Sequence, residues 1–325
     1  MALVPPSLLS LALLLTGVGQ IVPPAGAPGA ADAPPESTIA IGSHADRMTV
    51  PVQIAGAGPY RFIIDTGAER TVISRELAGT LGLAVGREVS IVAMTGVSRV
   101  GTVTIPSLSV STIAPTEAIQ APALAANDLG GQGLLGLDTL RDHKVLIDFD
   151  ASTMALAPST KRERGGADRR SDEIVVHARS TMGQLIVTDA EFEDRQIRVV
   201  IDTGAAISVG NSALRRLVAR QASRLKPITM TSVTGEALTA DYAQVDKVRV
   251  GGIEFVGLPI AFADAPPFER FGLVKRPALM LGMDALKFFR RVAIDFPNRE
   301  VRFQMPRADR LARRCISFVN GRCSA

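Results

Sequence analysis

Two copies of a short motif carry the residues that could do chemistry. Asp65-Thr66-Gly67-Ala68 and Asp202-Thr203-Gly204-Ala205 each follow a run of bulky apolar residues. Glycine at the third position leaves room for another backbone or a substrate, and the threonine hydroxyl can lock the turn through hydrogen bonds. Two such turns that met at a pseudo-twofold axis would bring Asp65 and Asp202 face to face.

Two carboxyl groups in contact cannot both ionise, so they share one proton and titrate as a pair. The ionised partner can then take a proton from a water while the protonated partner donates to a carbonyl oxygen. The duplicated aspartate therefore predicts amide hydrolysis without a metal ion and without a covalent intermediate.

The residues around the motif are duplicated as well. Leu134-Leu135-Gly136 recurs as Met280-Leu281-Gly282, and Val145–Phe149 recurs as Val292–Phe296. The matches keep their order, with the second copy about 140 residues after the first, which indicates two copies of one structural unit.

Within each copy the pattern favours short strands. Thr49–Ile54 and Tyr60–Ile64 in the first copy, and Leu185–Thr188 and Gln196–Ile201 in the second, are apolar runs bounded by turn residues, as expected for buried strands. Short helices are predicted to begin at Ser74 and Ser212, and further ones to cover 137–140 and 283–288. With 29 glycines and 20 prolines, turns are plentiful, so a mostly β fold is expected.

These motifs resemble those of the aspartic peptidases of the retropepsin-like (retroviral-type) family. The chain looks like two such units fused, as in the two-lobed pepsin arrangement, and the resemblance covers roughly residues 40–157 and 173–305. It implies the acid protease fold, mostly β with few short helices, in which two homologous β-barrel-like lobes are related by a pseudo-twofold axis. It further implies that Asp65 and Asp202 form the catalytic dyad. Thr66, Gly67, Thr203 and Gly204 would support the dyad, with the two apolar-apolar-Gly motifs packed beneath it.

The resemblance also implies substrate-binding residues. Met94–Ser98 and Val233–Ala237 are expected at hairpin tips that fold over the substrate as flaps, with Thr95, Gly96, Thr234 and Gly235 in contact with it. Glycine in each tip is expected to take a positive φ. Glu69 stands where the retroviral pattern has an acidic residue that contacts the substrate backbone, whereas the second copy has Ala206. The arginine that follows the apolar-apolar-Gly motif in that pattern is replaced here by Leu137 and Met283.

Ala68 and Ala205 replace the serine or threonine of pepsin-like motifs. A hydroxyl there would favour the charged carboxylate, so without it the dyad is expected to be less acidic. We expect an activity optimum at weakly acidic to neutral pH.

The sequence divides into five expected parts. Residues 1–31 are typical of a secretory signal peptide, with an apolar run from Leu8 to Val22 that is short for a membrane span; an uncleaved anchor is the alternative. Residues 32–160 and 173–306 form the two lobes, and 161–172 is a charged linker. Residues 307–325 form a tail in which Cys315 and Cys323 could pair in an oxidising compartment or remain free thiols. Export to the periplasm or the extracellular space is expected, with no membrane span in the mature chain.

Other classes of function fit poorly. A net charge of +4 without a basic stripe disfavours nucleic acid, and His44, His143 and His177 lack the spacing of a zinc site. Gly131–Gly136 matches a nucleotide-loop pattern but lies in no βαβ unit. Asp138, Asp284, Asp148 and Asp295 also recur, and cap or strand-end roles are expected for them.

Two functional classes remain. The first is an endopeptidase that takes a polypeptide substrate, needs no cofactor and works as a monomer, because its dyad forms within one chain. The second is a catalytically silent module that binds peptides with the same fold.

Overall fold

A computed structural model describes residues 37–40, 42–44, 47–110, 115–161, 173–181, 183–218, 225–306 and 316–318. The predicted signal peptide, both cysteines and all of the predicted linker except Lys161 lie outside these residues. The expected domain boundaries therefore remain predictions. Both predicted lobes belong to one compact unit, Glu36–Ala325.

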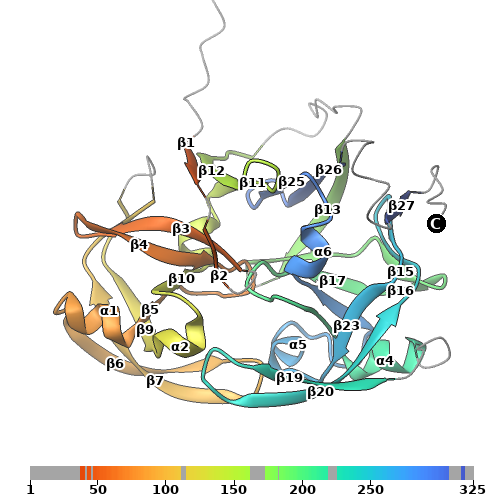
Figure 1. Ribbon diagram of the computed structural model, residues 1–325, viewed down its shortest axis with the longest axis horizontal. Helices are drawn as coiled ribbons and strands as arrows, with labels where there is room; N and C mark the ends of the chain where they lie inside the picture. The colour runs from red at the N-terminus through yellow and green to blue at the C-terminus, as the bar shows by residue number, and fades with distance from the viewer. Residues whose placement is uncertain are drawn as a thin grey trace, which may run out of the picture. The chain divides into compact units, whose positions relative to one another are not determined.

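The first lobe is a sheet built largely from neighbours distant in sequence (Figure 1). In spatial order its strands are β2 (Gly42–His44), β3 (Arg47–Ile54), β4 (Ala57–Ile64), β10 (Gly133–Leu135), β5 (Val72–Ser74), β9 (Ile119–Leu124), β7 (Val97–Ile105) and β6 (Val85–Val92), and β8 (Leu108–Ser109) pairs with β3. β10 runs parallel to β4 and β9 parallel to β5, whereas the other pairs are antiparallel.

The second lobe repeats this order. From β14 (Gln184–Val187) its sheet continues through β17 (Arg198–Ile201), β24 (Ala278–Leu281), β18 (Ser208–Gly210), β23 (Leu258–Phe262), β20 (Ala237–Val245) and β19 (Lys226–Thr231). β24 is parallel to β17, and β23 is parallel to β18, as in the equivalent pairs of the first lobe. The repeated order confirms the prediction of a mostly β fold made of two homologous lobes.

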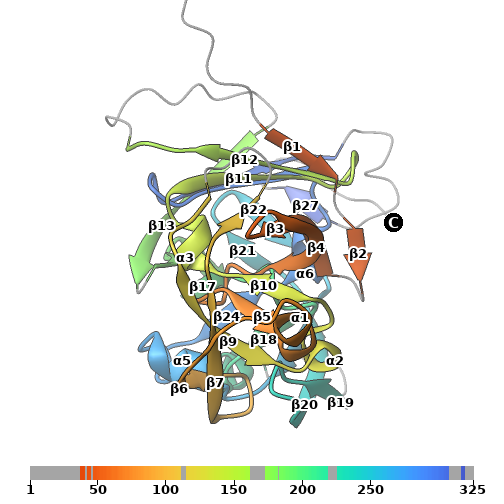
Figure 2. The ribbon, with the colours of Figure 1, turned by 90° about the vertical axis from the view of Figure 1, so that its left-hand side faces the viewer.

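A shared sheet joins the lobes on the side away from the hairpins β6–β7 and β19–β20 (Figures 1 and 2). β11 (His143–Asp148) of the first lobe pairs antiparallel with β25 (Arg291–Asp295) of the second. Outside this pair lie β12 (Thr153–Pro158) and β1 (Ser37–Ala40) on one flank, and β26 (Glu300–Gln304) and β13 (Glu173–Thr181) on the other.

The remaining elements are short. A further sheet has the order β16 (Arg195–Gln196), β15 (Ala190–Phe192), β21 (Val248–Val250), β22 (Ile253–Phe255) and β27 (Ile316–Phe318). The helices are α1 (Arg75–Thr80), α2 (Ala126–Leu129), α3 (Leu137–Leu140), α4 (Ser212–Val218), α5 (Pro266–Arg270) and α6 (Met283–Leu286). No helix in the described ranges combines the length and the apolar character that crossing a membrane requires.

The last three residues of each strand that leads to an aspartate are buried on both faces. In β4, Phe62, Ile63 and Ile64 are fully buried. Phe62 and Ile64 pack in the main core, whereas Ile63 points to the other face and packs in a separate cluster. A continuous apolar run is what such a strand needs, which is why the sequence pattern predicted it.

Three local predictions are wrong in part: the cap of α4, the strand over 196–201 and the end of the helix that begins at Met283. Ser74 caps α1 as predicted, accepting the N–H of Leu77 at 3.1 Å, but the residue that caps α4 is Asn211, whose side chain accepts the N–H of Leu214 at 2.9 Å. Ser212 instead bonds to Asp264. The single strand predicted over 196–201 is interrupted at Ile197, which belongs neither to β16 nor to β17. The helix predicted over 283–288 ends at Leu286.

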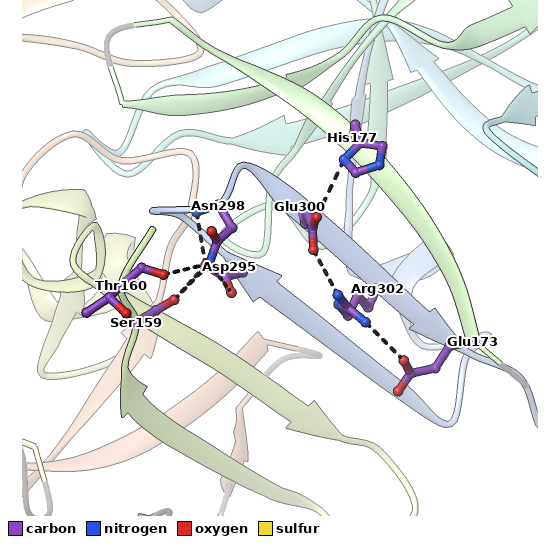
Figure 3. Close-up of polar contacts among 8 residues, drawn as sticks. All are labelled: Ser159, Thr160, Glu173, His177, Asp295, Asn298, Glu300 and Arg302. Atoms are coloured by element: carbon purple, nitrogen blue, oxygen red, sulfur yellow. Dashed lines mark hydrogen bonds and ion pairs between the residues drawn. The ribbon is translucent and has the colours of Figure 1, made fainter. Parts of the chain in front are cut away.

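Asp148 and Asp295 end equivalent strands and tie the shared sheet together. Oδ1 of Asp295 accepts from the backbone N–H of Asn298 at 3.1 Å and from the Ser159 hydroxyl, at the end of β12, at 2.8 Å (Figure 3). Beside them, Arg302 lies between Glu173 and Glu300 and links β13 to β26 (Figure 3). The predicted strand-end role of Asp148 and Asp295 is confirmed.

Asp148 bonds both to its own turn and to the other lobe. Its Oδ1 accepts from the N–H groups of Asp150 and Ala151 at 3.0 and 2.9 Å, and its Oδ2 binds Nε of Arg291, on β25, at 2.5 Å. Burial acts to raise the pKa of Asp148, but the hydrogen bonds from Ala151, Arg291 and Asp150, with the charge of Arg291, outweigh it and lower the pKa. The ionised form is thus favoured in the folded state.

Asp148→Asn should lower the free energy of unfolding at pH 7 by about 1–3 kcal/mol, because the charged partner of Arg291 is lost. A lowered pKa means that this stabilisation is present above the pKa of the unfolded carboxyl and disappears as the pH falls through the folded value. Urea unfolding at pH 7 and at about pH 2 should show a difference between variant and wild type only at the higher pH. Asp142→Asn, at a well-exposed carboxyl, is the control. An equal difference at both pH values would contradict this account.

Candidate active site

Asp65 and Asp202 lie on equivalent turns, directly after β4 and β17. The backbone N–H of each aspartate donates to a carbonyl of the apolar-apolar-Gly motif, Asp65 to Leu135 and Asp202 to Leu281, both at 3.0 Å. Oδ1 of Asp65 accepts from the N–H groups of Gly67 and Ala68, both at 2.9 Å. Oδ1 of Asp202 accepts from Gly204 at 2.9 Å and Ala205 at 3.2 Å. Both carboxylates are therefore fixed in the same way by their own turns.

Each glycine of the motif touches the carboxylate of the other lobe. A Cβ placed on Gly67 would lie 2.6 Å from Oδ1 of Asp202, and a Cβ on Gly204 would overlap the carboxylate of Asp65. Since Gly67 also donates to Asp65, the two acid groups share the space above the same pair of glycines. The structure thus brings together the residues that the sequence predicted to meet, and only glycine fits at these positions.

The two threonines cross between the lobes beneath the carboxylates. The hydroxyl of Thr66 donates to the carbonyl of Ile201 at 2.9 Å and accepts from the N–H of Thr203 at 3.0 Å. The hydroxyl of Thr203 donates to Ile64 at 2.8 Å and accepts from the N–H of Thr66 at 3.1 Å. Both side chains are buried, so these four bonds fix the separation of the two turns.

A second pair of hydroxyls went unnoticed in the sequence. Thr71 and Ser208 each stand six residues after an aspartate of the motif. Thr71 donates through its N–H and its hydroxyl to Asp138, and accepts from the N–H of Gly136 at 3.2 Å. Ser208 makes the same contacts with Asp284 and Gly282. The repeated spacing of a hydroxyl residue was the signal that could have found them.

Asp138 and Asp284 therefore bind the residues next to the Asp-Thr-Gly turns, rather than taking the cap or strand-end roles that were predicted for them. Neither helix has a side-chain cap. Burial raises the pKa of Asp284, and the hydrogen bonds from Ser208 offset part of that rise.

The predicted flaps are hairpin tips, and each packs against the opposite lobe. Met94, between β6 and β7, packs against the cluster of Ile186, Val200, Met280 and neighbours in the second lobe. Val233, between β19 and β20, packs against Ile63, Val72, Leu124, Leu129 and Leu134 in the first. Ile63 and Val200 stand two residues before the aspartates, so each cluster lies on the strand face from which an acid group emerges. The tips thus cover the apolar surface on both sides of the dyad.

The four flap residues differ in detail. Gly235 has a φ of 86° and lies against Asp128 of the first lobe, whereas Gly96 does not take the positive φ that was predicted for it. The first tip turns without one, closed by a bond from the N–H of Ala93 to the carbonyl of Gly96 at 2.8 Å. The Thr234 hydroxyl contacts Ser232 at 3.1 Å. The Thr95 hydroxyl is buried with no hydrogen-bond partner among the described residues.

Glu69 is held by the other lobe. Arg270, the last residue of α5, binds it with Nε on Oε1 and Nη2 on Oε2, both at 2.6 Å. The sequence did not indicate this guanidinium partner of Glu69, which comes from a distant part of the chain. Contact of Glu69 with substrate remains a prediction.

Gln184 is a further residue that sequence reasoning missed. It is fully buried, and its Nε2 donates to the carbonyl of Gly67 at 2.8 Å, while its Oε1 has no hydrogen-bond partner among the described residues. The described part of the chain contains no group of three or more His, Cys, Asp or Glu side chains placed to hold a metal ion.

Comparison with known families agrees with this geometry. Residues 50–142 match the family described as gag-polyprotein putative aspartyl protease, and residues 187–285 match the family described as aspartyl protease. No individual curated protein matches the chain significantly. The two matches together span more than half of the chain, and each contains one Asp-Thr-Gly turn. The chain therefore belongs to the retropepsin-like aspartyl proteases and carries two such domains in tandem.

Proposed function

We propose that this chain is an active aspartic endopeptidase whose dyad is Asp65 and Asp202. The observation that carries the proposal is the contact of each motif glycine with the carboxylate of the opposite lobe, which leaves the two acid groups side by side. Carboxyl groups so close share one proton. The pair thus holds both a base and an acid at one point.

Hydrolysis needs only these two groups and a water. The ionised carboxylate removes a proton from the water as its oxygen attacks the amide carbon, and the protonated partner donates to the carbonyl oxygen. The tetrahedral intermediate then collapses: the dyad gives its proton to the amide nitrogen, the C–N bond breaks and the amine leaves. One hydroxyl of the intermediate passes its proton to the other carboxylate as the carbonyl group of the new carboxylic acid forms. The dyad returns to its singly protonated state, so the cycle needs neither a metal ion nor another cofactor.

A polypeptide is the substrate that suits these surroundings. The two apolar clusters beside the dyad would accept apolar side chains on both sides of the scissile bond, once Met94 and Val233 lift away. The dyad is completed by one chain, which favours a monomer. Export is proposed from the apolar N-terminal segment alone.

A catalytically silent peptide-binding module is the second candidate. It would keep the fold and the hairpins, but it has no chemical need for two carboxylates in mutual contact, which repel each other when both are ionised. Intact acid groups in both turns favour the enzyme.

Asp65→Asn and Asp202→Asn, made separately, should each reduce cleavage by at least about 1000-fold, because either change removes the acid–base pair. Asparagine keeps the side-chain oxygen that the turn binds, so folding should persist, as circular dichroism can verify. The assay is cleavage of an unbiased peptide library, with Asp142→Asn as the matched surface control. Turnover within about 10-fold of wild type in either variant would refute the dyad. Peptide binding without cleavage by the wild type would support the silent module.

The pH–rate profile should peak at weakly acidic to neutral pH. Ala68 and Ala205 offer no side-chain donor, so the dyad receives only backbone hydrogen bonds from these positions. Adding hydroxyls in an Ala68→Ser/Ala205→Ser variant should move the profile to lower pH, because they would stabilise the ionised form. A wild-type peak near about pH 2, or no movement in the variant, would argue against this explanation.

Thr95→Val should lower kcat/KM roughly 3- to 10-fold without lowering the thermal midpoint. The hydroxyl of Thr95 is buried and unpartnered at the tip that covers the second-lobe cluster, so its removal costs no bond in the free protein. If it bonds to the substrate backbone under the closed hairpin, the loss is felt in catalysis alone. Thr234→Val, which breaks a contact within the other tip, is the comparison. Unchanged kcat/KM in the Thr95 variant would exclude this role.

A further inference from the structure

A hollow of about 550 Å³ opens beside the turn that carries Asp65. Its lining includes Glu69 and Arg70, the two residues that follow the motif, and Arg141 at the end of α3. Gly183 also lines it, and the next residue, Gln184, donates to the carbonyl of Gly67. The hollow therefore lies next to the segment that carries Asp65, on the side lined by Glu69, Arg70 and Gly183.

The acidic groups of this hollow are already bound by the protein. Both carboxylate oxygens of Glu69 accept from Arg270. Both oxygens of Asp138 accept from the N–H of Thr71, and Oδ1 also accepts from its hydroxyl. A cationic ligand would have to displace these donors.

The basic groups of the hollow, unlike its acidic groups, are not held by strong contacts within the protein. Arg70 is exposed and has no ion pair or hydrogen bond with any described residue. Arg141 approaches only Asp142, at 3.8 Å, and both of these side chains are largely exposed. Two guanidinium groups thus line the hollow with most of their N–H donors available, and among the side chains of a polypeptide a carboxylate matches the geometry of such a fork.

The second lobe lacks this feature. Ala206 and Ile207 occupy the positions that correspond to Glu69 and Arg70. The guanidinium after the motif therefore stands on one side of the dyad only. A ligand that bound it would fix the direction in which a peptide lies across the two carboxylates.

We propose that Arg70, assisted by Arg141, binds an acidic side chain of the polypeptide substrate in this hollow, on one side of the scissile bond. The inference rests on the proposed peptidase function and adds to it a charge preference and a direction. Arg70 is then a specificity-determining residue.

The test is a matched substrate series. A fluorogenic peptide that the wild-type protein cleaves is varied at each position in turn, with Glu, Gln and Lys compared by kcat/KM. At one position Glu should be preferred over Gln roughly 5- to 10-fold, with Lys poorer still. Arg70→Glu should reverse the order of Glu and Lys at that position. Arg75→Glu, an equal change of charge at an exposed residue of α1 away from the hollow, should keep the wild-type order.

Three results would overturn the proposal. They are the absence of any position that prefers Glu, an unchanged order in Arg70→Glu, and the same reversal in Arg75→Glu.

A binding arm separates this inference from the peptidase assignment. Fluorescein-labelled peptide pools that differ only in carrying Glu or Gln are titrated into wild-type protein and Asp202→Asn, followed by anisotropy. Tighter binding of the Glu pool that disappears in Arg70→Glu supports the hollow even if no peptide is cleaved. Equal binding of the two pools refutes the hollow, whether or not the dyad cuts.

Discussion

The structure depends on one interaction, the crossed hydrogen bonds of Thr66 and Thr203. Each hydroxyl donates to the carbonyl of the residue that ends β4 or β17 in the other lobe, Ile64 or Ile201. Each hydroxyl also accepts a hydrogen bond from the backbone N–H of the other threonine. Both side chains are buried, so breaking the cross would leave several polar groups unpaired away from water. Separating the two turns would therefore cost free energy. The pairing of β11 with β25 joins the same two lobes at a second place. These hydrogen bonds hold two acid groups in one site, although the two carboxylates repel each other when both are ionised.

The hydrogen bonds that hold the two aspartate turns are the same in both lobes, whereas the residues that follow the two motifs differ. Motif, threonine cross and the Thr71–Asp138 and Ser208–Asp284 braces are repeated closely in both lobes. Next to the motif the lobes diverge, with Glu69 and Arg70 on one side and Ala206 and Ile207 on the other. Glu69, which has no equivalent in the second lobe, forms an ion pair with Arg270 of that lobe. In the proposed peptidase, a near-symmetric dyad would accept a peptide in either direction, so these unequal flanks are where a single direction would be selected.

The two-lobed fold and the position of the two aspartates could be predicted because the same sequence motifs occur twice in the chain. The repeated Asp-Thr-Gly turns, the apolar-apolar-Gly motifs and the strands before them follow local patterns that hold in both copies. What failed depends on contacts that no local pattern reports. Arg270 lies 201 residues from its partner Glu69, and the amide of Gln184 reaches Gly67 from 117 residues away. Asn211 caps α4 while the adjacent Ser212 is drawn to Asp264, a choice set by tertiary packing. Gly96 needs no positive φ because its hairpin closes with another turn geometry.

The proposed function requires the two carboxylates to act as one unit on one reacting group. A crystal structure with a substrate peptide whose scissile amide is replaced by a secondary alcohol, a mimic of the tetrahedral intermediate, tests it most directly. A shared dyad should place the alcohol oxygen within hydrogen-bond distance of carboxylate oxygens from both Asp65 and Asp202, with the two hairpin tips closed over the peptide. A peptide bound elsewhere, or an alcohol that reaches only one of the two acids, would contradict it.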